Sequence, residues 1–96
     1  MTKVLHITPH LSGGVGAVLL ETLKFYVDKP NYDHTIVAFE ELLDSELRYF
    51  ADFHHAITNT HDYGEIESLV LEADIVHVEW WTHPLIYLFL FKFRFP

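Results

Sequence analysis

The sequence predicts an α/β protein built on a parallel sheet, and two observations indicate this class. Short runs rich in apolar and β-branched residues alternate with longer segments in which apolar residues recur every three or four positions, as in strands joined by helices. Within the runs the apolar residues are consecutive, which is typical of strands buried on both faces. Right-handed crossovers between such strands favour the strand order 3-2-1-4, with helices on both faces of the sheet.

The first strand and the first helix flank a glycine-rich turn. Residues 4–8 form the expected strand, which Pro9 ends because proline has no backbone N–H group. The expected helix covers residues 15–27. Three glycines lie in the turn: Gly13, Gly14 and Gly16. Without Cβ atoms they allow a sharp turn and let a ligand approach the N–H groups of the helix N-terminus, where a phosphate is the simplest guest.

The rest of the chain continues the alternation. The expected strands cover residues 32–39, 54–58 and 74–78, and the expected helices cover residues 46–52, 65–73 and 84–92. Ser45 and Thr82 are the expected N-caps of the second and last helices, and Leu47 and Phe50 are expected to point inward. The last strand, which is apolar and β-branched, is expected to be buried.

Composition excludes several classes of protein. A chain of 96 residues allows one domain, and a hydrophobic content of 50% is too high for a chain that is disordered by composition. The net charge of −8 argues against nucleic acid as a partner. The chain has no cysteine and no visible signal peptide, so we expect a cytoplasmic protein. Its longest apolar run, residues 84–91, is shorter than the roughly 20 residues that span a bilayer.

Two loops carry the candidate site. With the order 3-2-1-4, the strand order reverses between the first and fourth strands, and ligands bind beyond the carboxyl ends of strands at such a point. Residues 10–16 and 79–83 meet there. The candidates for phosphate or sugar binding are His10, Gly13, Gly14, Gly16, Trp80 and Trp81. Glu79 and His83 are the candidates for a general acid or base.

Each candidate also has a structural interpretation. The glycines can serve a tight turn alone, the tryptophans can belong to the core, and a single histidine is often simply hydrogen-bonded. A dinucleotide site using Glu40 is a minor alternative, because Leu19 occupies the third glycine position of that fingerprint. Four neighbouring residues, His54, His55, His61 and Asp62, lack the spacing of a metal motif. We therefore expect no metal and no cofactor.

Both loops resemble those of a known enzyme family. The segments VLHITPHLSGGVG and DIVHVEWWTHP, residues 4–16 and 74–84, are similar to the N-terminal Rossmann-like domain of retaining GT-B glycosyltransferases, which include glycogen-synthase-like and sucrose-synthase-like enzymes. The resemblance implies transfer of a sugar from a nucleotide-sugar donor to a sugar or lipid acceptor. It also implies that the glycine loop lies over the donor diphosphate. In the family pattern D-x-V-H-x-H, His77 holds the first histidine position and Glu79 replaces the second.

The family also uses a second, nucleotide-binding domain, which 96 residues do not accommodate. The resemblance therefore implies that residues 1–96 form the acceptor-side domain, incomplete at the C-terminus because the sequence ends before a fifth strand. Such a chain is expected to need a C-terminal domain or a partner chain for activity. The alternative is a non-catalytic module that binds another protein, or a second copy of itself, through Leu85, Leu88 and Phe91.

Overall fold

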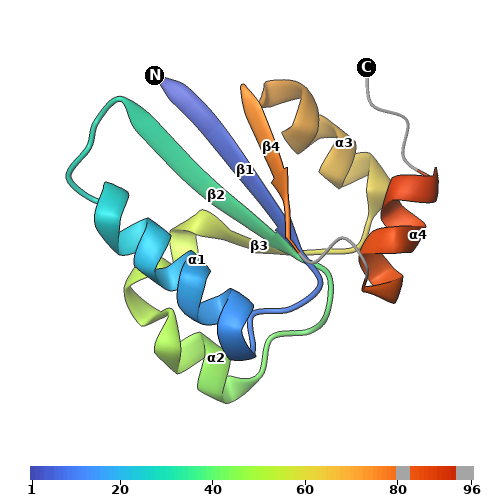
Figure 1. The fold of residues 1–96 in the computed structure, drawn as a ribbon, viewed down its shortest axis with the longest axis horizontal. Coiled ribbons are helices and arrows are strands. Elements are labelled where there is room, and N and C mark those ends of the chain that lie inside the picture. The colour runs from blue at the N-terminus through green and yellow to red at the C-terminus, as the bar shows by residue number, and fades with distance from the viewer. Residues whose placement is uncertain (80–82, 93–96) are drawn as a thin grey trace.

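The computed structural model describes residues 1–79 and 83–92 and contains a sheet of four parallel strands in the order β3-β2-β1-β4. The strands are β1 (Thr2–Thr8), β2 (Tyr32–Ala38), β3 (Ile57–Asn59) and β4 (Ile75–Val78). The helices are α1 (Gly13–Tyr26), α2 (Asp44–Tyr49), α3 (Tyr63–Glu72), α4 (Pro84–Lys92) and the short 3-10 helix η1 (Ala51–Ala56). The predicted fold class and strand order are confirmed (Figure 1).

Helices cover both faces of the sheet, and each face has its own core (Figure 1). On one face α3 and α4 pack on β1 and β2, and the buried side chains there are Leu5, Ile7, Val37, Phe39, Ile66, Val70, Ile86 and Phe89. On the other face α1, η1 and the end of α2 pack on β2, and the buried side chains are Leu11, Leu19, Leu20, Leu23, Ile36, Ala38, Phe50 and Ala56. The sheet therefore has a hydrophobic core on each face, as expected for a layered α/β architecture.

The strand register decides which side chains share a face. His6 lies opposite Ile36 of β2 and opposite His77 of β4, and Val4 lies opposite His34. Partners in a parallel ladder point to the same face, and residues two apart on one strand also share a face. His6, His34 and His77 therefore all project from the face that α1 covers, since Ile36 packs in that core.

The structure corrects several local predictions. The third strand begins at Ile57, so His54 and His55 belong to η1 and not to a strand. Strand β4 is not buried, because it forms the edge of the sheet: Ile75 is 51% exposed. Phe50, which directly follows α2, is buried as expected, whereas Leu47 within α2 is exposed.

The helix caps also differ from the prediction. Helix α2 has Leu43 rather than Ser45 at its N-cap, and the Leu43 N–H donates to the Glu46 carboxylate at 2.8 Å. His83 directly precedes α4: its carbonyl accepts from the Tyr87 N–H, and its Nδ1 accepts from the Leu85 N–H at 3.2 Å. The expected cap Thr82 lies outside the described residues. A histidine thus caps α4 and is fixed by it.

Candidate functional site

His10, Glu40 and His83 come together beyond the carboxyl ends of β1, β2 and β4. Each offers a ligand atom, and these atoms lie within 4.8 Å of one another. The His10 and His83 rings meet edge to face, with centroids 5.7 Å apart. Each residue belongs to a different connecting segment, and the meeting point is where the strand order reverses between β1 and β4. The structure thus brings two of the predicted site residues, His10 and His83, side by side.

Backbone hydrogen bonds set the orientation of both histidines. The Ser12 N–H donates to Nδ1 of His10 at 3.2 Å, as the Leu85 N–H does to Nδ1 of His83. A neutral imidazole carries one N–H, so each ring that accepts at Nδ1 has its proton on Nε2. The Thr8 hydroxyl also donates to the His10 carbonyl at 2.8 Å and holds the start of the loop. Both imidazoles therefore have their N–H group on Nε2, and one nitrogen of each ring lies within 4.8 Å of a Glu40 carboxylate oxygen.

The three glycines have three different roles. Gly13 has a φ of +65°, a conformation that strains other residues, and it turns the chain into α1. A Cβ on Gly16 would overlap the Leu11 carbonyl oxygen, so Gly16 permits close packing inside the protein. A Cβ on Gly14 would have no described atom within 4 Å. Of the three, Gly14 is the position where a side chain could be added without backbone strain and without overlap with a described atom.

The N-terminus of α1 is a candidate position for an anion, beside a hollow that the acidic residue Glu46 also lines. Its N-cap Ser12 makes no side-chain capping bond within the described part of the chain, and the first turn contains no acidic residue. The first N–H groups of a helix lack partners inside the helix and carry partial positive charge. Beside this end a hollow of about 340 Å³ runs to α2, with Ser12, Gly13 and Tyr49 in its lining. The predicted phosphate-binding turn therefore borders a surface hollow.

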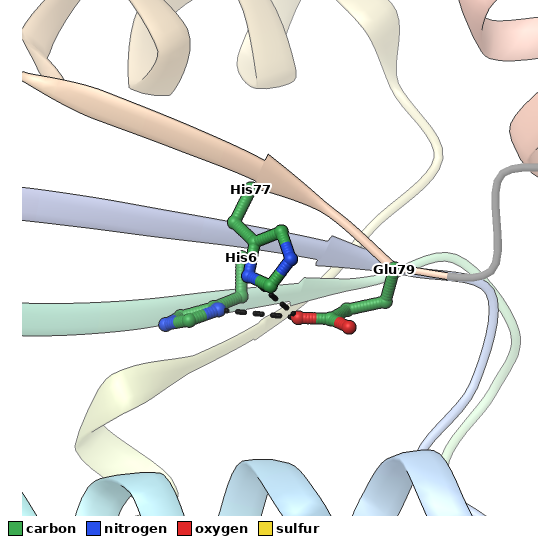
Figure 2. Close-up of side chains that lie close together, drawn as sticks. All are labelled: His6, His77 and Glu79. Carbon is green, nitrogen blue, oxygen red and sulfur yellow. Dashed lines mark hydrogen bonds and ion pairs between the residues drawn. The ribbon is translucent and has the colours of Figure 1, made fainter.

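Glu79, which like His83 is a predicted candidate for a general acid or base, lies in a different cluster. Its Oε1 is 3.0 Å from Nδ1 of His77 and 3.4 Å from Nδ1 of His6 (Figure 2). Its N–H donates to the Ile7 carbonyl at 2.8 Å, so the backbone of Glu79 still extends the ladder with β1. The carboxylate is held on the α1 side of the sheet (Figure 2). The Glu79 carboxylate is thus grouped with histidines of β1 and β4, whereas His83 is grouped with His10 and Glu40.

This second cluster is centred on His6, which is only 5% exposed. Nε2 of His6 lies 2.9 Å from Nδ1 of His34, and the two rings stack with centroids 5.1 Å apart. Burial, with the nearby His34 and His77, lowers the pKa of His6 to about 4. Burial also lowers the pKa of His34, against the opposing effect of Asp33. His6 is therefore neutral at pH 7, and its contact with Glu79 is a hydrogen bond from a neutral ring.

The sequence analysis missed His6 and His34. One signal was present, because three of the expected strands each contain a histidine: His6, His34 and His77. Only the register shows that the three share a face. Trp80 and Trp81 lie outside the described residues.

Comparisons of the chain with protein families, with curated proteins and with solved structures found no match. Among residues 1–79 and 83–92, no helix has both the length and the apolar character needed to cross a bilayer. The function is therefore argued from the geometry of the site.

Proposed function

We propose that this chain is the acceptor-side, Rossmann-like domain of a retaining GT-B glycosyltransferase. The observation that carries the proposal is the meeting of His10 and His83 at the reversal point of the sheet, beside the N-terminus of α1. Ligands of open parallel sheets bind at this position. The resemblance of the two loops to that family supplies the reaction class.

The chemistry of the site suits a sugar attached to a phosphate. Imidazole N–H groups and helix N–H groups donate to phosphate and hydroxyl oxygens. Glu40 is an exposed acceptor that repels a bare anion but binds the hydroxyl groups of a sugar. We assign diphosphate contact to the backbone of Gly13 and Gly14, and contact with the transferred sugar to His83.

The assignment of Glu79 changes under this proposal. Its carboxylate is engaged by His6 and His77, so His10 and Glu40 replace it beside His83. Catalysis in this family needs a second domain that binds the nucleotide, so the 96-residue chain is expected to bind ligand without turnover. A chain without cysteine is compatible with the cytoplasmic location that we propose.

Titration of the ¹⁵N-labelled chain with a uridine diphosphate sugar, followed by NMR, tests this proposal. We expect weak saturable binding with shifts at His10, Gly13, Gly14 and His83. Gly14→Val should weaken binding, because its side chain would occupy the space of the ligand, whereas His61→Ala on the polar turn before α3 is the matched control. Shifts that avoid the His10–His83 region, or binding unchanged in Gly14→Val, would contradict the assignment.

A second candidate function, self-association, rests on α4. Tyr87, Leu88 and Phe91 are exposed on this helix, and Phe91 is 81% exposed. Leu85, predicted to belong to the same surface, instead packs partly buried against the core. Sedimentation of the chain and of a Leu88→Glu, Phe91→Glu variant tests this function. Oligomers that dissociate in the variant would support it, and a monomer at high concentration would exclude it.

A further inference from the structure

We propose that His6, His77 and Glu79 form a binding site for a divalent transition-metal ion, with Zn²⁺ the best match to the donor set. This site lies on the α1 side of the sheet (Figure 2). It shares no residue with the cluster of His10, Glu40 and His83. It therefore goes beyond the proposed function and does not depend on it.

Two of the three distances between ligand atoms match those around a tetrahedral ion. Around Zn²⁺ with ligand bonds of about 2.0 to 2.1 Å, neighbouring ligand atoms lie about 3.3 Å apart. Oε1 of Glu79 lies 3.4 Å from Nδ1 of His6 and 3.0 Å from Nδ1 of His77. One ligand atom from each of the three residues lies within 4.8 Å of the others. Two imidazoles and one carboxylate leave a fourth position for water, as in many Zn²⁺ sites that are open to ligands.

The site is rigid on one side and accessible on the other. His6 is buried in the central strand β1, paired to a strand on each side. His77 belongs to the edge strand β4, and its side chain is 60% exposed. The sheet thus fixes two ligands at the same level while the edge gives an ion a path from solvent. The net charge of −8 favours the approach of a cation.

His34 supplies the outer contact that metal-binding histidines usually have. Its Nδ1 lies 2.9 Å from Nε2 of His6, the nitrogen that would point away from the ion. Nε2 of His34 is buried and has no hydrogen-bond partner among the described residues. Nε2 of His34 can therefore be either bare or protonated, so this ring is able to change its tautomer.

Metal binding would move protons between the ring nitrogens of His6 and His34 without changing the number of protons on the two rings. When Nδ1 of His6 donates to Glu79, its Nε2 accepts from Nδ1 of His34, and Nε2 of His34 is bare. When the ion occupies Nδ1 of His6, the proton of that ring is on Nε2 and is donated to Nδ1 of His34, whose own proton is then on Nε2. Binding is therefore expected to switch the tautomers of both His6 and His34.

The test is titration of the metal-free chain with ZnCl₂, followed by calorimetry and by long-range ¹H–¹⁵N spectra of the histidine rings. We expect one ion per chain and a tautomer switch at His6 and His34. Glu79→Gln and His77→Ala should each weaken binding by at least about 100-fold, more than the roughly 10 to 100-fold typical of losing an outer contact. His61→Ala, and Glu40→Gln in the other cluster, should bind as the parent does.

Absence of saturable binding, or unchanged affinity in Glu79→Gln, would overturn the site. Loss of binding in Glu40→Gln would also overturn it, because it would place the ion at the His10–His83 cluster. The tautomer of His6 can be read in the unsubstituted chain. The proposal can therefore be refuted even if one of the variants misfolds. Saturation with Zn²⁺ that leaves both His6 and His34 in their original tautomers would refute it.

Discussion

Replacing Gly16 by alanine tests how the glycine turn is built. The added Cβ would lie 2.8 Å from the Leu11 carbonyl carbon and would overlap its oxygen. An ordinary contact between carbon atoms needs about 3.5 Å, so the carbonyl carbon alone would have to retreat by about 0.7 Å, and the overlapping oxygen requires a larger shift. The Leu11 side chain is only 2% exposed and packs in the core beneath α1, so this shift disturbs buried contacts.

The magnitude follows from two opposing effects. Overpacking of this kind costs up to about 3 kcal/mol, and alanine in place of glycine in a helix returns up to about 1 kcal/mol. Gly16→Ala should therefore lower the free energy of unfolding by about 2 kcal/mol, which corresponds to roughly 10 °C in Tm for a domain of this size. Gly14→Ala is the matched control, because its Cβ meets no described atom within 4 Å.

Urea denaturation followed by circular dichroism measures both variants. We expect Gly14→Ala to be at least as stable as the parent chain, so that the two variants differ by about 3 kcal/mol. Equal stability of Gly16→Ala and Gly14→Ala would show that Leu11 and α1 are not packed as described. The comparison also separates the glycine that the fold needs from the one that we assign to a ligand.

Three further predictions concern stability. Phe89→Ala should cost about 3 to 5 kcal/mol in urea denaturation, because Phe89 is fully buried under the sheet, and a cost below about 1 kcal/mol would show that α4 is not docked there. Asp62→Ala should cost about 1 kcal/mol, since its carboxylate accepts the Gly64 N–H at 2.9 Å at the start of α3; an unchanged midpoint would argue against this cap. With a chelator present, acidification should destabilise the fold through His6, whose pKa of about 4 lies below its ordinary value of 6.5. On acidification the His6 side chain takes up its proton in the unfolded chain at a higher pH than in the folded chain. The free energy of unfolding should therefore be unaffected above pH 6.5 and fall by about 3 kcal/mol as the pH decreases to 4. A flat stability profile between pH 7 and 4 would contradict this prediction.

The topology could be predicted from sequence because it depends on the alternation of strands with helices and on the right-handedness of the crossovers between strands. Apolar runs separated by amphipathic segments leave few arrangements once crossovers are right-handed. The same rules place residues 10–16 and 79–83 at one end of the sheet, and His10 and His83 do meet there. Side-chain partners depend on register, which these rules do not supply.

Glu79 shows what register adds. Its partner His6 lies 73 residues away, and the pairing of β1 with β4 places the two together. From sequence alone, Glu79 is grouped with the other residues of the loop at residues 79–83. The exposure of β4 was missed for a related reason: its residues are as apolar as those of a central strand, and only the order of the sheet shows that it is an edge.

A long-range ¹H–¹⁵N spectrum of the histidine rings during titration with a nucleotide sugar tests the proposed ligand site. We predict that His10 and His83 start as Nε2–H tautomers and that their resonances move together and saturate, while those of His54 and His55 stay fixed. Resonances of His10 and His83 that remain in place while the ligand binds elsewhere would contradict the claim that their meeting point is the site.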